Sequence, residues 1–213
     1  MTVELLNIDC IEYMKMQRDG VFDLAIVDPP YGVERFKKPI GNGGRMFGGD
    51  SRADKNGIEW DIIPSAEYFK ELKRVSTNQI IWGANYMLDY LPPTRGIIFW
   101  DKKQPVPNFS DGELAWTSFD RPAKCFRFMY TNVVGRDVNH FHPTQKPVNL
   151  YRWLLANYAK KGQTILDTHL GSGSSAIAAH YFGCNFVGCE IDQYYYHAAK
   201  ERFDKETAQL AFF

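Results

Sequence analysis

Short apolar runs recur along this chain, and most of them are bounded by glycine, proline or charged residues. Runs of this length bounded by turn residues predict buried strands. We expect strands over residues 3–8, 22–27, 79–82, 96–100, 113–119, 125–130, 164–167 and 185–189. The two runs at 113–119 and 125–130 look like strands of a part of the sheet in which more of the pairing is antiparallel.

Segments with apolar residues at helical spacing lie between several of these runs. Pro147 opens the clearest example, in which Val148, Tyr151 and Leu154 recur on one face. We expect helices over residues 10–16, 64–75, 147–162, 174–182 and 193–205. Strands that alternate with helices predict an α/β fold, with a mostly parallel sheet and helices on both of its faces.

One stretch, residues 32–59, breaks this pattern, with seven glycines, many charges and few aliphatic residues. It is longer than the usual connection in a compact domain, so it is either a functional loop or a disordered insert. Its cationic residues make it a candidate arm for phosphate groups, and they are Arg35, Lys37, Lys38, Arg45 and Arg52.

Length, charge and cysteine content limit the classes of protein to which this chain could belong. The 213 residues, 45% of them hydrophobic, suffice for one large domain or two small ones. The 25 basic and 25 acidic residues cancel, so overall charge gives no support for a nucleic-acid partner. The four cysteines form no C-x-x-C pair, and we expect no metal site. Without a signal peptide or a membrane-length apolar run, we expect a reduced, cytoplasmic protein with no membrane partner.

Candidate chemistry first appears where the run 22–27 ends, in Asp28-Pro29-Pro30-Tyr31. Proline lacks an N–H and fixes φ, so the chain stops pairing there and its carbonyls can face a cleft. A carboxylate, carbonyl acceptors and an aromatic face together suit a planar base that carries an amino group. A simple strand-ending turn is the alternative interpretation.

A second candidate site follows the run 164–167. Asp167 precedes a turn that contains Gly171 and Gly173, and a helix begins immediately afterwards. Glycines allow a ligand to approach the backbone closely, and Glu190 ends the next strand, where an acid can bind ribose hydroxyls. The unit predicts a nucleoside site. Its spacing also fits a dinucleotide fingerprint, but Asp167 favours the positively charged S-adenosylmethionine over a pyrophosphate.

Together the two motifs resemble the amino-group DNA methyltransferases that use S-adenosylmethionine. Asp28 to Tyr31 matches their catalytic motif, and residues 167–175 are similar to their cofactor motif. Because the catalytic motif comes first, the chain resembles the circularly permuted β class, as does the string at residues 142–147. Smaller matches at residues 82–86 and 113–118 resemble phage and prophage members, and the resemblance covers nearly the whole chain.

The resemblance implies a single Rossmann-like methyltransferase domain over residues 1–213, built on a mostly parallel seven-stranded sheet. It implies transfer of a methyl group from S-adenosylmethionine to adenine N6 in double-stranded DNA, with the base flipped out of the helix. Asp28, Pro29, Pro30 and Tyr31 would be the catalytic residues. The implied cofactor residues are Asp9, Cys10, Asp28, Thr144, Lys146, Asp167, His169, Gly171, Ser172, Gly173 and Glu190. Asp9 and Cys10 would lie at the adenine, and Thr144 and Lys146 near the methionine carboxylate.

Some points stay open from sequence. Thr168-His169 stands where the family usually has Pro-Phe, which puts the strength of cofactor binding in question. Residues 33–59 and 102–141 are the candidate DNA-facing segments, with Arg45, Arg52, Lys102 and Arg136 as candidate contacts. Cytosine-N4 or RNA-adenine methylation, a silent nucleic-acid binder and an NAD-dependent dehydrogenase are the alternatives. A homodimer and a restriction partner are further options raised by the resemblance.

Overall fold

A computed structural model gives the structure, and it describes residues 1–32, 61–103, 110–129, 141–142 and 144–208. The predicted loop at 33–59 therefore lies outside the described residues, as do much of the segment 102–141 and the candidate contacts Arg45, Arg52 and Arg136.

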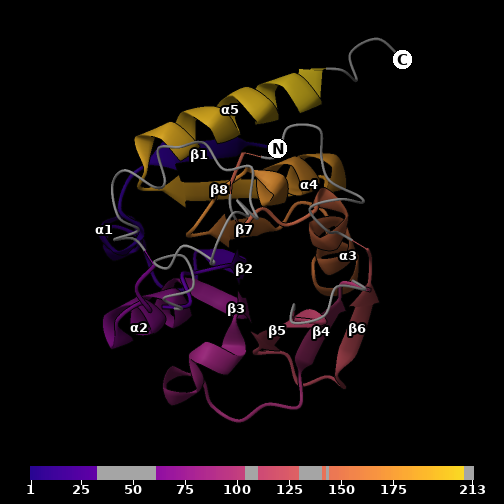
Figure 1. Cartoon of the computed structure of the whole chain (residues 1–213). Coiled ribbons are helices and arrows are strands. Elements are labelled where there is room, and N and C mark those ends of the chain that lie inside the picture. Colours follow the sequence, from indigo (N-terminus) through magenta and orange to yellow (C-terminus); the bar gives the residue numbers. More distant parts are fainter. Residues whose placement is uncertain (33–60, 104–109, 130–140, 143, 209–213) are drawn as a thin grey trace, which may run out of the picture.

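The described strands form one sheet in the order β1-β8-β7-β2-β3-β5-β4-β6 (Figure 1). The strands are β1 (Val3–Asn7), β2 (Phe22–Val27), β3 (Ser76–Trp82), β4 (Ile97–Asp101), β5 (Gly112–Thr117), β6 (Lys124–Arg127), β7 (Thr164–Asp167) and β8 (Asn185–Glu190). Strand β5 pairs antiparallel with both β3 and β4, whereas every other pairing between neighbours is parallel.

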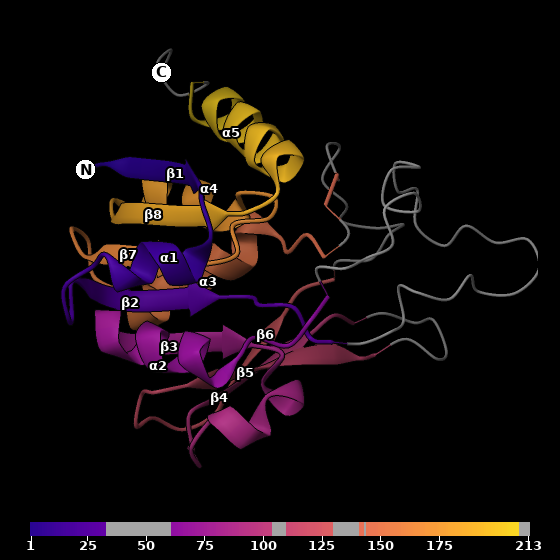
Figure 2. The same ribbon diagram turned by 90° about the vertical axis from the view of Figure 1, so that its left-hand side faces the viewer.

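Helices cover both faces of this sheet. They are α1 (Cys10–Lys15), α2 (Ala66–Val75), α3 (Val148–Tyr158), α4 (Ser174–Phe182) and α5 (Gln193–Ala208), with short 3₁₀ turns η2 (Ala84–Tyr86) and η3 (Leu88–Tyr90). Figures 1 and 2 show α1 and α2 on one face, α3 and α4 on the other, and α5 beside β1 at the edge. The first strand and the last helix therefore lie together.

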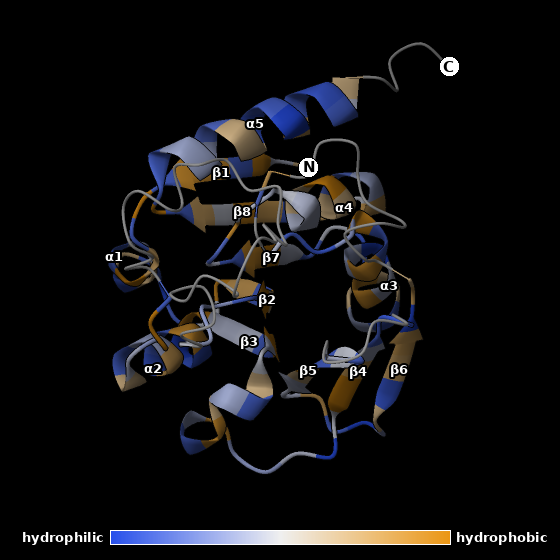
Figure 3. Cartoon of the chain, in the orientation of Figure 1, coloured by the Kyte–Doolittle hydropathy of each residue, from blue (hydrophilic) through white to orange (hydrophobic). Residues whose placement is uncertain are grey.

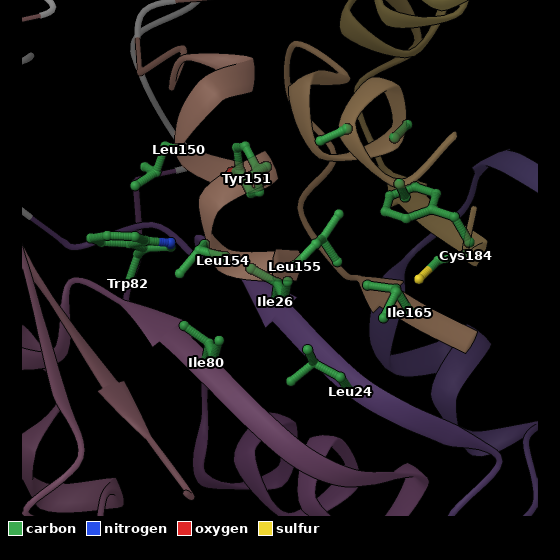
Figure 4. Close-up of a cluster of buried hydrophobic side chains, with 14 of the residues drawn as sticks. Leu24, Ile26, Ile80, Trp82, Leu150, Tyr151, Leu154, Leu155, Ile165 and Cys184 are labelled. Carbon is green, nitrogen blue, oxygen red and sulfur yellow. The ribbon is translucent and has the colours of Figure 1, made fainter. Parts of the chain in front are cut away.

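The apolar runs pack into two cores, one on each face. On one face, Leu24, Ile26, Ile80 and Ile165 point from the sheet toward α3, whose inner side carries apolar residues (Figure 4). On the other face, Phe69 and Leu72 of α2 pack over Ala25 and Val27. Figure 3 shows hydrophobic residues in β7 and β8 and a mostly hydrophilic α5. Burial of these side chains is the main driving force for the fold.

The prediction of an α/β fold with a mostly parallel sheet is confirmed, with three differences in detail. The described sheet has eight strands and not seven. We expected residues 113–119 and 125–130 to form a more antiparallel section. Strand β5 is antiparallel to its neighbours, but β6 pairs parallel to β4 at the edge of the sheet. Helix α3 ends at Tyr158, before Gly162, because the chain becomes extended at Ala159. No helix in the described ranges is both long enough and apolar enough to cross a membrane.

Candidate active site

The sheet brings the predicted motifs to one edge. Strand β7 leads through α4 to β8, whereas β2 leads through α2 to β3, and α4 and α2 cover opposite faces (Figure 1). The connections that follow β7 and β2 therefore leave toward opposite faces of the sheet. Open α/β sheets bind ligands at such a switch point, at the carboxyl ends of the strands. Asp167 ends β7 and Asp28 directly follows β2, so one carboxylate flanks this point from each side.

Asp28 is held by two side chains from different parts of the sequence. Its Oδ1 accepts a hydrogen bond of 2.6 Å from the Tyr31 hydroxyl, and its Oδ2 accepts a short one from Lys146 Nζ. The Lys146 side chain is only 4% exposed, so its charge is compensated by neighbours and not by water. Sequence analysis placed Lys146 near the cofactor carboxylate, and in this structure it contacts Asp28 and Tyr31 of the predicted catalytic motif.

Two further residues complete this group, and sequence analysis gave neither of them a role there. Glu113 Oε2 lies 3.0 Å from Lys146 Nζ, and its Oε1 accepts a hydrogen bond from Lys102 Nζ. Glu113 reaches the site because β5 runs antiparallel, so its beginning lies where β3 ends. We call Asp28, Tyr31, Lys146, Glu113 and Lys102 the carboxylate–lysine cluster.

The protonation of this cluster follows from burial and charge. Burial acts to raise the pKa of Glu113, but Lys146 and Lys102 hold that pKa at about 2. Burial acts to lower the pKa of Lys146, and the two carboxylates outweigh it, so this pKa is raised above its ordinary value. Burial raises the pKa of Asp28, against the opposing effect of Lys146. Ion pairs of this kind hold their geometry only while every member is present.

The Tyr31 ring is fixed by its packing. It stacks on Tyr86 with ring centroids 5.1 Å apart, and Lys146 Nζ lies 5.7 Å from the centre of the Tyr31 ring. Gly83 has a φ of +70°, and a Cβ at this position would lie 2.1 Å from a Tyr31 ring carbon. Gly83 therefore makes room for the aromatic member of the catalytic motif.

The second motif forms a turn fixed by Glu190. Gly171 and Gly173 have φ values of +52° and +76°, and the Gly171 N–H donates a 2.9 Å hydrogen bond to Glu190 Oε2. Glu190 Oε1 accepts from the Asp192 N–H. A carboxylate has about four lone-pair sites, so both oxygens can still accept ribose hydroxyls.

Asp167 is the buried acid of this turn. Its side chain accepts hydrogen bonds from the Ser175 hydroxyl at 2.6 Å and from the His169 N–H at 3.0 Å. Burial raises the pKa of Asp167 to about 7, although these two hydrogen bonds act to lower it. A cationic amino group beside Asp167 would favour its ionised form.

The unusual pair Thr168-His169 is hydrogen-bonded to α2. The Tyr68 hydroxyl lies 2.6 Å from Thr168 Oγ1, which in turn lies 2.9 Å from His169 Nδ1. The Tyr68 and His169 rings meet edge to face, with centroids 5.5 Å apart. Burial lowers the pKa of His169 to about 4, so its ring is neutral at pH 7.

The remaining predicted residues lie around this turn. Asp9 caps α1 by accepting from the Ile11 and Glu12 N–H groups, and burial raises the pKa of the adjacent Cys10 thiol to about 12. Ser172 is buried, and its carbonyl accepts a hydrogen bond from Arg202 of α5. Thr144 is exposed and hydrogen-bonds to His142 Nδ1.

The charges and hydrogen-bonding groups of these residues suit S-adenosylmethionine. The turn has glycines where a Cβ at Gly171 would crowd His142 and one at Gly173 would crowd Ala199. Its side chains are acceptors and acids, which suit ribose hydroxyls, an amino group and a sulfonium. Within the described ranges, no group of three or more His, Cys, Asp or Glu residues could hold a metal ion.

Comparison with known proteins agrees with this geometry. A family model described as DNA methylase matches residues 116–201, which include Lys146, the glycine turn and Glu190. The chain is 26% identical to the type II methyltransferase M.HinfI of Haemophilus influenzae, over 93% of this chain and 67% of that protein. It is 23% identical to the type II methyltransferase M2.DpnII of Streptococcus pneumoniae, over 95% of this chain and 90% of that protein. Together these matches make the chain similar to type II DNA methyltransferases over most of its length, and they support a DNA methyltransferase.

Two solved structures with a similar fold are informative. The complex of M1.HpyAVI with SAM has a TM-score of 0.59 at 19% identity, covering 94% of this chain and 100% of that one. The cytosine-N4-specific PvuII DNA methyltransferase has a TM-score of 0.66 at 12% identity, covering 98% of this chain and 91% of that one. At these identities the likeness establishes the fold.

The family match and the carboxylate–lysine cluster support each other. Asp28 lies before the matched residues 116–201, but it is bonded directly to Lys146 within them. Sequence analysis did note the strings that contain Gly83, Tyr86 and Glu113, yet their contacts with Tyr31 and Lys146 depend on strand order. Tyr68 gave no signal beyond its place on an amphipathic helix.

Proposed function

We propose that this chain transfers a methyl group from S-adenosylmethionine to the N6 amino group of adenine in double-stranded DNA. The observation that carries this proposal is the Asp28 carboxylate, which is held at the switch point of the sheet by Tyr31 and Lys146. The family match supports DNA as the substrate. Dimerisation and a restriction partner rest on the resemblance alone, and a cytoplasmic location stays an expectation from the sequence.

Asp28 and the Pro29 carbonyl would accept the two hydrogens of the target amino group. Accepting both favours a pyramidal nitrogen, whose lone pair then points at the methyl donor, and this positioning supplies most of the rate. S-adenosylmethionine supplies the electrophilic methyl group when bound. Tyr31 would stack on the base, which must leave the duplex at a cost of about a few kcal/mol.

The turn would hold the cofactor. Glu190 would accept the ribose hydroxyls, and the buried Asp167 would lie toward the cationic methionine part. Asp9 and Cys10 would lie toward the adenine. No covalent intermediate is required, which agrees with the two buried cysteines Cys184 and Cys189 having raised thiol pKa values.

Adenine is favoured over cytosine by the residue at position 28. Relatives that act on cytosine N4 more often have serine where this chain has Asp28. The likeness to the PvuII enzyme concerns the fold and carries no weight for the choice of base.

Replacing the Asp28 carboxylate tests the proposal. We expect Asp28→Ala to abolish methyl transfer while S-adenosylmethionine binding stays within a few-fold of wild type, measured by calorimetry. Asp120→Ala is the matched control, because its carboxylate is 87% exposed and pairs with Arg95 on the surface. Normal turnover by Asp28→Ala would refute the assignment.

A further inference from the structure

The pair Thr168-His169 is joined to Tyr68 by two consecutive hydrogen bonds. Tyr68 comes from α2, and both its hydroxyl and that of Thr168 are buried. A hydroxyl has one proton to donate and can accept two hydrogen bonds, and among the described residues the buried Thr168 hydroxyl has Tyr68 and His169 as its partners and no other. Its proton must therefore go to one of these two, because a buried donor without an acceptor is costly. Two arrangements are available, and they leave different protons on His169.

The environment of Tyr68 selects one arrangement. Burial holds the pKa of Tyr68 well above its ordinary value, so its hydroxyl keeps its proton. Among the described residues, the Tyr68 hydroxyl has Thr168 Oγ1 as its hydrogen-bond partner and no other. Tyr68 must therefore donate to Thr168, because a buried donor without an acceptor is costly.

The rest of the chain of bonds then follows. Thr168 Oγ1 accepts from Tyr68, so its own proton points to His169 Nδ1, which must be unprotonated to accept it. A neutral imidazole carries its proton on one nitrogen, so the proton is on Nε2. Among the described residues, His169 Nε2 has no hydrogen-bond partner, and the ring is only half-buried.

The order of the strands says which part of a ligand this N–H would meet. The ends of β1, β8 and β7 follow one another across the sheet, carrying Asp9, Glu190 and Asp167. The ribose of S-adenosylmethionine lies between its methionine part and its base. With the methionine part at Asp167 on β7 and the ribose at Glu190 on β8, the base would therefore continue toward the end of β1. The Asp9 carboxylate lies near enough for its charge to act on the pKa of His169. His169 thus lies on the side of the turn that faces the base.

We infer that Tyr68, Thr168 and His169 form a directional hydrogen-bond relay that presents His169 Nε2–H as a donor to the adenosine part of the cofactor. This inference rests on the proposed function, because S-adenosylmethionine is the ligand. The relay would give the cofactor one directed polar contact at this turn. His169 is then a cofactor-binding residue, and Tyr68 and Thr168 are positioning residues.

The direction of the relay can be measured without any ligand. Two-bond ¹H–¹⁵N spectra of ¹⁵N-histidine-labelled protein distinguish the two tautomers, and His169→Leu identifies the signals of residue 169. We expect the proton on Nε2 in wild type. Thr168→Val should let the Nδ1–H form appear, whereas Tyr90→Phe should change nothing, because Tyr90 stacks on Phe69 without touching the relay. A proton on Nδ1 in wild type would overturn the inference.

The contact itself is tested by ligand binding. We expect His169→Leu to weaken both S-adenosylhomocysteine and 5′-methylthioadenosine by about 3- to 10-fold, the value of one hydrogen bond. His169→Gln, whose amide N–H can take the place of Nε2–H, should restore most of the loss. An equal loss of affinity in His169→Leu and His169→Gln would overturn the inference. A loss for S-adenosylhomocysteine alone would also overturn it, because the contact would then be with the amino-acid part of the ligand.

These measurements are separate from methyl transfer. A chain that binds both ligands as expected but methylates no DNA would contradict the proposed function and leave the relay standing. Thermal melting of each variant shows whether it folds. The tautomer of His169 in the wild-type protein gives the direction of the relay even if a variant does not fold.

Discussion

At the scale of single residues, the site depends on buried charges that compensate one another. Lys146 lies between Asp28 and Glu113 and is almost fully buried, so it neutralises two acids that would otherwise repel each other. A buried ion pair adds little net stability, but removing one partner leaves an uncompensated charge. Lys146 is therefore the residue on which the geometry of Asp28 depends most.

Removing the Lys146 charge should destabilise the fold. We expect Lys146→Met to lower the free energy of unfolding by about 3–5 kcal/mol at pH 7, measured with urea. Lys15→Met is the control, because Lys15 pairs with Glu67 on the surface, and it should change stability little.

A second substitution checks the cause. Adding Glu113→Gln to Lys146→Met removes one of the two acids that Lys146 neutralised and leaves their mutual repulsion relieved, so the double variant should be more stable than Lys146→Met alone. Strictly additive losses would mean that the two residues do not interact.

At the scale of elements, the site is made by strand ends and the turns that follow them. Asp28, Asp167 and Glu190 were predictable from sequence, because apolar runs mark the strands and the acids follow directly. Gly83 belongs to the same edge, where β3 ends and η2 begins. These turns give the ligand site its shape, whereas the strands give it stability.

The turn at Gly83 can be tested against a glycine of similar conformation. Gly83→Ala and Gly20→Ala both force alanine to a positive φ, at a cost of roughly 1–2 kcal/mol. Nothing lies within 4 Å of a Cβ at Gly20, whereas one at Gly83 would collide with Tyr31. We expect larger losses of stability and of methyl transfer in Gly83→Ala. Equal effects in both variants would show that Tyr31 does not depend on Gly83.

The turn after β7 should carry two opposite pH dependences. The pKa of Asp167 rises on folding from 3.8 to about 7, so its contribution to stability is lost as pH rises across that range. The pKa of His169 falls on folding from 6.5 to about 4, so its contribution is lost as pH falls across that range. The two contributions oppose each other in wild type.

Single substitutions should separate them in urea unfolding between pH 4.5 and pH 7. Relative to wild type, we expect Asp167→Asn to gain stability as pH rises and His169→Phe to gain stability as pH falls. Each tenfold change in proton affinity corresponds to about 1.4 kcal/mol. Stability curves parallel to wild type would contradict both pKa shifts.

At the scale of the whole molecule, the sheet brings together residues that are far apart in sequence. Asp28, Glu113 and Lys146 come from three segments and meet because β5 enters the sheet antiparallel beside β3. The apolar runs predicted most strands, and the motifs at residues 28–31 and 167–175 carried the resemblance to the family. Neither indicated the position of Glu113, which depends on long-range strand pairing. Tyr68 was hidden for the same reason, since its contact with Thr168 joins residues 100 positions apart.

The central claim is the reaction itself, and one measurement tests it most directly. Purified protein is incubated with labelled S-adenosylmethionine and unmethylated DNA, and the DNA is then digested to nucleosides. We expect the label in N6-methyladenine, and sequencing of the modified sites would give the target. Label in N4-methylcytosine would contradict the choice of base, and absence of label from DNA would contradict the reaction.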